Sequence, residues 1–279
     1  MGPALLFACA VCGSAERGLP ENGAETAFEG RKRATLDVRA AGFATTSGDT
    51  QGDRVVELRA EPGAAASVGE RTMLGAYVPA LQRTIDAPGA SRETQTTLGD
   101  IELRVTYTAL RAIGRHLSLD GGLKLPTAPI QHDGLGRTLT PDLQPGCSAI
   151  VPLVGATYLW SGSLASAWTS VSLLMPVSVR ENAPHPGDSA RASATVQLQP
   201  STFFATRLGA YARYDSTAEL DGAALPRSGG ASVHVAPQVV LAPVRDLVVT
   251  LGAAFPIVQA MRAYRSTSPV LLASAGVDF

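Results

Sequence analysis

Two cysteines near the N-terminus have the spacing in this chain that most directly suggests chemistry. They stand in the stretch Cys9-Ala-Val-Cys12-Gly13. Two thiolates separated by two residues can bind one copper or zinc ion, or can form a redox-active disulfide. Gly13 stands where a c-type haem site requires His, which excludes haem attachment. A plain disulfide, or loss of Cys9 through processing or lipidation, is the simpler interpretation, and we expect no other cofactor.

The third cysteine and the four histidines show no comparable arrangement. Cys147 begins a candidate strand, and we expect a lone thiol that serves packing. His132 and His185 are predicted in external loops, where solvated side chains are the simpler interpretation and a loop metal site is the alternative. His116 and His234 fall on the polar faces of candidate strands.

Motifs of enzyme active sites are absent from the sequence. It contains no Gly-x-Ser-x-Gly, no glycine-rich phosphate loop, no HExxH and no paired carboxylate arrangement. We therefore expect no enzymatic activity.

The composition favours a chain of strands over a chain of helices. The 279 residues are 45% hydrophobic and 17% charged, and the net charge of −1 gives no reason to expect nucleic acid as a partner. No run of about 18 apolar residues is present, so a transmembrane helix is not expected. The 28 glycines and 19 prolines suit a protein with many turns.

Alternation of apolar and polar residues predicts twelve strands. It is clearest in Ile101–Leu110, His116–Leu125, Arg191–Gln199 and Ser232–Leu241, where period two extends over eight to ten residues. Segments of about this length cross a bilayer when tilted. The weaker candidates are residues 31–46, 53–61, 66–83, 147–160, 164–180, 202–214, 245–258 and 268–279.

The lengths of the connections alternate as well. The links after even strands are short, whereas those after odd strands are mostly long, and only the first of these, residues 47–52, is brief. Bacterial outer-membrane barrels have short periplasmic turns and longer external loops, whereas a soluble β-sandwich has no reason to segregate loop length. The short links are residues 61–65, 111–114, 161–163, 200–201 and 243–244, and the long ones are residues 82–97, 128–146, 181–189, 215–229 and 259–267.

These patterns predict an all-β protein, a transmembrane antiparallel up-and-down β-barrel of about twelve strands over residues 31–279. Residues 1–30 are interpreted as a signal-peptide remnant and periplasmic leader, and Leu6-Phe-Ala-Cys9 loosely resembles a lipobox. In lipid every backbone polar group needs an internal partner, which a closed barrel supplies. Five prolines inside candidate strands weigh against the model unless they lie at strand ends or bulges: Pro79, Pro152, Pro176, Pro237 and Pro256.

The last strand should close the barrel against the first. One face of this strand carries Leu271 and Val277 and is expected to contact lipid, while Ser274 and Asp278 should face the lumen. A final amphipathic strand that ends in an aromatic residue, here Phe279, resembles the C-terminal strand of outer-membrane barrels, where that residue is part of the assembly signal. The resemblance implies outer-membrane lipid and the barrel-assembly machinery as partners.

Several short phrases together resemble a known family. They are Gly99-Asp-Ile-Glu-Leu-Arg-Val-Thr-Tyr107, Gly122-Leu-Lys-Leu-Pro-Thr127, Asp142-Leu-Gln-Pro-Gly146, Gln259 and the terminal Phe279. Residues 95–279 are thereby similar to loosely defined bacterial outer-membrane barrels assigned to transport, including those named for phenol-degradation pathways. In that family Gly usually follows the threonine, where this chain has Ala128. The resemblance implies a barrel and a transport role for unassigned solutes.

The predicted lumen is the candidate functional site. Charges of both signs along a narrow passage would select small solutes as they cross. The alternative is a non-conducting structural or interaction barrel, filled by its own ion pairs or plugged by residues 13–30, whose Cys9/Cys12 pair binds a metal ion or a periplasmic partner. Outer-membrane lipases of twelve strands place a catalytic Ser and His on the lipid face. His116 and His234 are predicted to point inward, which argues against lipase activity. The residues predicted to line the lumen are Asp37, Arg39, Glu57, Arg59, Glu102, Arg104, His116, Asp120, Lys124, Arg191, Gln197, Arg207, Arg213, His234 and Gln238.

Overall fold

A computed structural model describes most of the chain after residue 31. The described residues are 32–47, 50–86, 92–131, 144–178, 186–220, 223–224, 228–244, 246–261 and 265–279. Within these ranges no helix is long and apolar enough to span a membrane.

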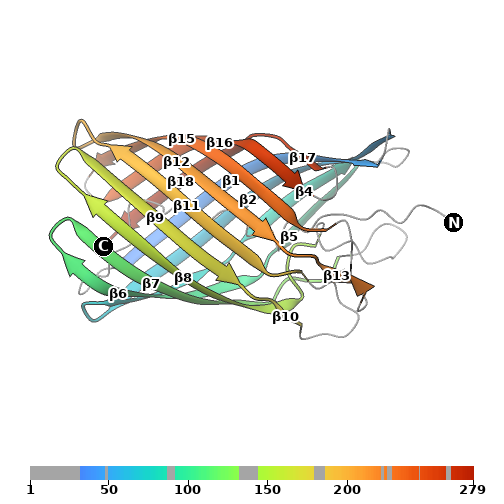
Figure 1. Cartoon of the computed structure of the whole chain (residues 1–279), viewed down its shortest axis with the longest axis horizontal. Coiled ribbons are helices and arrows are strands. Elements are labelled where there is room, and N and C mark those ends of the chain that lie inside the picture. Colours follow the sequence, from blue (N-terminus) through green and yellow to red (C-terminus); the bar gives the residue numbers. More distant parts are fainter. Residues whose placement is uncertain are drawn as a thin grey trace.

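The described residues form a closed antiparallel barrel of twelve strands (Figure 1), which confirms the predicted fold. Several barrel strands consist of two segments separated by a short interruption, namely β3 with β4, β5 with β6, β9 with β10 and β17 with β18. The remaining pair, β13 with β14, is a small separate hairpin. In chain order the strands are β1 (Lys32–Ser47), β2 (Thr50–Val68), β3 (Thr72–Tyr77), β4 (Ala80–Asp86), β5 (Glu93–Leu98), β6 (Ile101–Ala112), β7 (Arg115–Leu125), β8 (Ala149–Ser161), β9 (Ala165–Leu174), β10 (Val177–Ser178), β11 (Ser189–Leu198), β12 (Phe204–Asp215), β13 (Glu219–Leu220), β14 (Ala223–Ala224), β15 (Gly230–Val244), β16 (Leu247–Met261), β17 (Arg265–Thr267) and β18 (Val270–Asp278).

The barrel closes between its first and last strands, as the sequence predicts. β1 pairs antiparallel with β18 from Arg33 opposite Asp278 to Ala40 opposite Leu271. The Arg33 Nε donates to Asp278 Oδ1 at 2.6 Å across this seam. No edge strand is left at the closure, so the backbone groups of both strands are paired.

The two faces of the wall differ in polarity. On β6, Leu103, Val105 and Tyr107 are exposed on the outside, whereas Glu102 and Thr106 are buried on the inside. Exposed Leu, Val and aromatic side chains recur in the same way on the other strands. An apolar band of this extent around a closed barrel is stable in lipid. The chain is therefore an integral outer-membrane protein, in agreement with the prediction.

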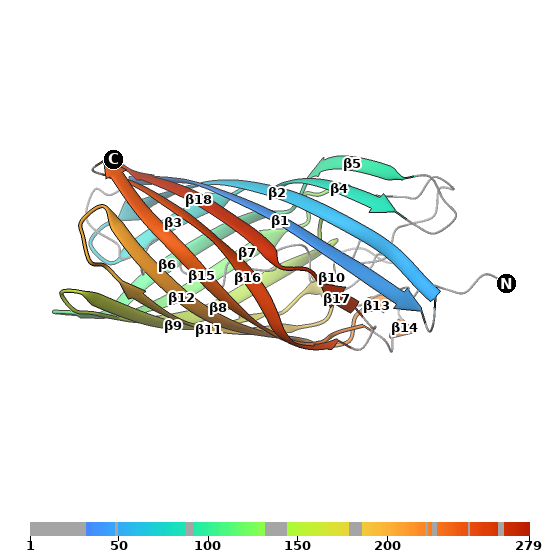
Figure 2. The ribbon, with the colours of Figure 1, turned by 90° about the horizontal axis from the view of Figure 1, so that it is seen from above.

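The two ends of the barrel are built differently. The C-terminus lies at the end with the short turns, and the β1–β2 hairpin and the β4–β5 pair extend beyond the opposite end (Figure 2). The predicted long link of residues 82–97 is therefore wrong in part, because β4 continues to Asp86 and β5 begins at Glu93.

The predicted short link at residues 61–65 is also wrong. β2 continues through Pro62 and Gly63, and the chain turns only after Val68, at Gly69 with φ +76°. A Cβ on Gly63 would lie 2.1 Å from Cδ1 of Tyr77 on the neighbouring strand. The glycine is thus required by the aromatic ring that lies across it, and the Pro-Gly pair does not mark a turn here.

Three of the five strand prolines lie at positions where a missing N–H disrupts few backbone hydrogen bonds of the sheet. Pro79 and Pro176 occupy the interruptions between β3 and β4 and between β9 and β10. Pro256 lies beside the register shift in the β15–β16 pairing. Pro152 and Pro237 remain inside continuous strands, and the carbonyl oxygen of Pro152 accepts the N–H of Met175 at 3.1 Å.

Candidate functional site: the barrel lumen

Strand alternation brings the predicted polar residues to the inner face of the wall. The apolar residues between them, such as Leu103 on β6 and Leu208 on β12, are exposed on the outer face. The structure thus places these side chains inside the barrel, while their part in solute passage stays a prediction. Glu102, Lys124, Arg207, His234 and Gln238 are buried, and Arg104, His116, Asp120, Arg191 and Arg213 are half-buried.

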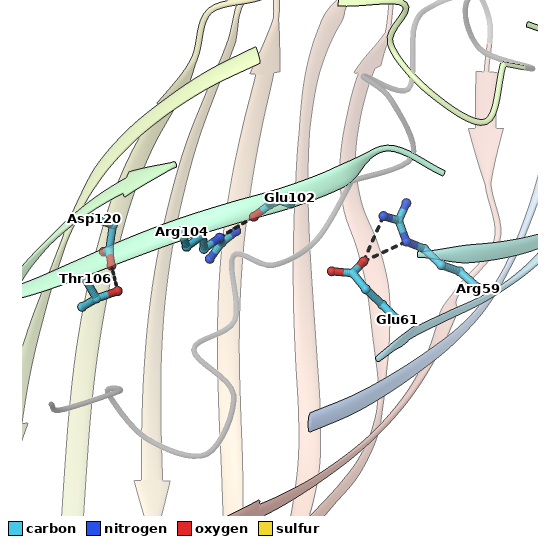
Figure 3. Close-up of polar contacts among 6 residues, drawn as sticks. All are labelled: Arg59, Glu61, Glu102, Arg104, Thr106 and Asp120. Carbon is cyan, nitrogen blue, oxygen red and sulfur yellow. Dashed lines mark hydrogen bonds and ion pairs between the residues drawn. The ribbon is translucent and has the colours of Figure 1, made fainter. Parts of the chain in front are cut away.

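Ion pairs line the wall formed by β2, β4 and β6. Arg59 Nη2 donates to Glu61 Oε2 at 2.9 Å, and both side chains are almost fully buried. Arg104 is paired with Glu102 two residues before it on β6 (Figure 3). Residues two apart on a strand point to the same face, so each pair is built within one strand.

Asp120 on β7 is held by hydroxyl groups from both neighbouring strands. Thr106 Oγ1 on β6 donates to Asp120 Oδ1 at 2.8 Å (Figure 3), and Thr157 Oγ1 on β8 donates to Asp120 Oδ2 at 3.3 Å. The carboxylate therefore has a fixed orientation on the inner face.

The opposite wall presents an arginine bound to neutral partners. Arg207 on β12 donates from Nη2 to Gln197 Oε1 at 2.8 Å and from Nη1 to Gln238 Oε1 at 3.5 Å. Its guanidinium carbon lies 4.9 Å from the centroid of the Trp168 ring, a cation–π contact. Nearby, the rings of Tyr211 and His234 stack with centroids 4.8 Å apart.

Sequence reasoning did not single out Trp168, which is only 1% exposed. It lies on the inner face of β9 in register with Thr195 of β11. The sequence contained the signal. Trp168 is two residues from both Ser166 and Ser170 and shares their face of the strand, which is opposite to the face of Leu173.

Charges from opposite walls interact across the lumen. Arg191 on β11 interacts electrostatically with Glu102 and Arg104 on β6, as well as with Arg213 and Asp215 on β12. β7, β8 and β9 lie between β6 and β11 in the sheet, so the interaction with β6 crosses the interior. Lys124 on β7 interacts likewise with Arg59 and Glu61 of β2 and with Glu102 of β6. Charged side chains of both signs thus lie on several strands of the inner face.

Connections at the far end from the C-terminus fold against the inner wall. Residues 144–148, which precede β8, are all buried. Cys147 packs there with Val151, Leu153, Leu174 and Ala218, the last of which belongs to the connection between β12 and β15. Described parts of two different connections thus pack together at this end of the barrel.

The prediction that Cys147 is a lone thiol is wrong, because Cys147 is disulfide-bonded. The chain has three cysteines, and the other two, Cys9 and Cys12, lie outside the described residues. So do His132, His185 and the leader of residues 1–30. Within the described ranges no three His, Cys, Asp or Glu side chains group as a metal site requires.

Comparisons with known proteins support the architecture. No family model and no curated protein sequence matches this chain. An outer-membrane channel from Pseudomonas putida F1 superimposes with a TM-score of 0.75 at 10% identity, covering 92% of this chain and 98% of that chain. The translocator domain of the autotransporter NalP from Neisseria meningitidis gives a TM-score of 0.51 at 10% identity, covering 93% of this chain and 90% of that chain.

At these identities the likeness shows the fold alone. It agrees with the predicted barrel and with the predicted outer-membrane location, whereas no family model supports the narrower resemblance to phenol-degradation barrels. The first of these structures is a channel and the second is a translocator domain. The chain is an integral outer-membrane β-barrel with the fold of outer-membrane channels.

Proposed function

We propose that this protein is a passive outer-membrane channel for small solutes, with its selectivity set by the charges that span the lumen. The observation that carries the proposal is the set of charged side chains on the inner face of the wall, among them the Arg59–Glu61 and Arg104–Glu102 pairs. A solute that passes along this wall exchanges its hydration for contacts with fixed charges, and such exchange is how polar pores select. The similar fold of an outer-membrane channel supports the same conclusion.

The distribution of charge favours anionic solutes. The inner face of β11 and β12 carries Arg191, Arg207 and Arg213, with Asp215 as the acidic partner of Arg213 at 2.9 Å. Arg207 donates to the neutral side-chain amides of Gln197 and Gln238 on the same inner face. An excess of fixed positive charge on one wall raises the local concentration of anions.

Single-channel recording in planar lipid bilayers tests the proposal. We expect discrete and reproducible current steps from protein that shows heat-modifiable migration on gels, the signature of a folded barrel. The same preparation unfolded by heat serves as the control. Absence of current over repeated insertions of folded protein would overturn the channel proposal.

A non-conducting structural barrel is the second candidate, and one observation favours it. The buried residues 144–148 and the packing of Cys147 against Ala218 fill space at one end of the lumen. In this alternative the Cys9/Cys12 pair binds copper or zinc, or a periplasmic partner. Because the chain has three cysteines and Cys147 is disulfide-bonded, metal binding by both thiolates requires that disulfide to be reduced. Metal analysis of wild type against the variant Cys9→Ser/Cys12→Ser tests that idea, and equal metal content in both would end it.

We assign no enzymatic activity and no nucleic-acid partner to this protein. The partners proposed are outer-membrane lipid, the barrel-assembly machinery and a small-molecule solute. Arg59, Arg104 and Asp120 take part in the ion pairs and hydrogen bonds described above.

A further inference from the structure

One carboxylate binds both ends of the connection between β7 and β8. Asp100 lies in the interruption between β5 and β6 and is 1% exposed. Its Oδ1 accepts the N–H of Ala128 at 3.0 Å, and its Oδ2 accepts the N–H of Cys147 at 2.6 Å. Ala128 follows β7 and Cys147 precedes β8, so a single side chain joins the two ends of this connection.

The same junction is reinforced by Thr127. The backbone N–H of Ile101 donates to Thr127 Oγ1 at 3.0 Å, and that hydroxyl group in turn lies 3.4 Å from the carbonyl oxygen of Gly99. Gly99 and Ile101, the residues on either side of Asp100, are therefore both hydrogen-bonded to Thr127.

A second set of bonds holds the connection farther from β7. Gln144 donates from Nε2 to the carbonyl oxygen of Gln131 at 3.0 Å and accepts the N–H of Gln131 at 2.9 Å. Arg83 on β4 donates from Nη1 to the carbonyl oxygen of Gln144 at 2.9 Å. Arg83 is itself paired with Glu57 of β2, so the connection is attached to the inner wall.

Close approach at this junction requires glycine. A Cβ on Gly146 would lie 2.3 Å from Asp100 Oδ1 and 2.5 Å from the Ala128 Cβ. A Cβ on Gly99 would lie 2.8 Å from Cγ of Pro79 and 2.9 Å from Cδ1 of Leu81. Both glycines let backbone reach positions that any side chain would block.

Three phrases that are separate in the sequence meet at this junction. They are the Gly99-Asp100 pair, Thr127 at the end of Gly122–Thr127, and Gly146 at the end of residues 142–146. Their meeting point lies on the inner face, since Asp100 alternates in phase with the inward-facing Glu102.

We propose that Asp100 is a positioning residue that holds residues 126–131 and 144–148, the described ends of the β7–β8 connection, against the inner wall and thereby limits the cross-section open to solute. This inference rests on the proposed channel function. Two charge-assisted hydrogen bonds from backbone N–H groups to one buried carboxylate are strong, and their loss leaves two buried donors unsatisfied. Removal of the carboxylate breaks one hydrogen bond at each end of the connection at the same time.

Backbone hydrogen exchange tests the holding role without any need for conduction. In Asp100→Ala, backbone N–H groups in residues 126–131 and 144–148 should exchange about tenfold faster than in wild type, because two hydrogen bonds to a buried carboxylate are lost. Asp100→Asn is the second variant in case Asp100→Ala does not fold, and heat-modifiable migration identifies folded protein. Glu93→Gln, an exposed carboxylate on β5, is the matched control with unchanged exchange.

Single-channel recording on the same preparations tests the consequence for the lumen. The folded Asp100 variant should give a larger unitary conductance than wild type and Glu93→Gln. Unchanged exchange in residues 126–131 and 144–148 would overturn the holding role. Faster exchange with an unchanged current step would overturn the limit on cross-section. Faster exchange with no current in any folded protein, wild type included, would support the holding role and reject the channel function.

Discussion

Arg207 is the residue at which the chemistry of the lumen is most sharply defined. Its guanidinium group lies over Trp168 and donates to two glutamine side chains, Gln197 and Gln238. The aromatic face and the amide oxygens hold the cation in a fixed orientation on the inner face. A positive charge held in this way is suited to attract an anion that passes along the wall.

We predict that Arg207→Gln lowers the preference of the channel for anions over cations. The permeability ratio should fall by about threefold, equivalent to ~0.6 kcal/mol, within the range for interactions of solvated charges. The reversal potential in a salt gradient across a planar bilayer measures this ratio. Arg115→Gln, at an exposed position beside the turn between β6 and β7, is the control. A ratio that moves equally in both variants would contradict a special role for Arg207.

At the scale of elements, the β2–β3 hairpin shows how tertiary contacts override a local turn signal. Pro62 and Gly63 lie inside β2, and the carbonyl oxygen of Pro62 accepts the N–H of Val78 at 3.0 Å. Gly63 is directly opposite Tyr77 in the register. The ring of Tyr77 occupies the space above the glycine, so β2 continues where Pro-Gly would ordinarily end a strand.

We predict that Gly63→Ala destabilises the barrel by about 1–3 kcal/mol, the usual range for overpacking, because its Cβ meets the Tyr77 ring. The midpoint of unfolding in denaturant, followed by heat-modifiable migration, measures the loss. Combination with Tyr77→Ala provides the control, since removal of the ring removes the clash. If Gly63→Ala costs as much in the Tyr77→Ala background as in wild type, the ring is not the cause.

At the scale of the whole molecule, the closing seam joins the first and last described residues. The N–H of Phe279 donates to the carbonyl oxygen of Lys32 at 2.9 Å, and the N–H of Lys32 donates to the carbonyl oxygen of Phe279 at 3.1 Å. The Phe279 side chain is 72% exposed and therefore adds little packing within the barrel. Its backbone serves closure, which leaves its aromatic ring available to a partner.

We predict that Phe279→Ala lowers the amount of folded barrel in the outer membrane of cells severalfold while protein refolded in detergent keeps its stability. The reason is that the side chain contributes to assembly and not to packing. Quantification of heat-modifiable protein in membrane fractions measures the effect. Leu271→Ala, which removes another outward apolar side chain of β18 that is 61% exposed, is the matched control. An equal loss in both variants would remove the special role of the terminal residue.

The sequence by itself determined the features that depend on period two. The twelve strands, the closure of β18 on β1 and the inward direction of residues such as Glu102 and Arg207 follow from alternation, because side-chain direction along a strand is a local property. The sequence predicted a turn at Gly63, where the structure has a continuous strand. This could not be predicted, since it depends on the ring of Tyr77 in the neighbouring strand.

Only the tertiary structure decided which distant residues meet. Asp100 receives N–H groups from Ala128 and Cys147, and Arg191 interacts with Glu102 across the lumen. These contacts depend on the tilt of the strands and the curvature of the closed wall, which bring together residues that no local pattern relates. Alternation assigns each side chain to a face, whereas the closed barrel decides what that side chain meets there.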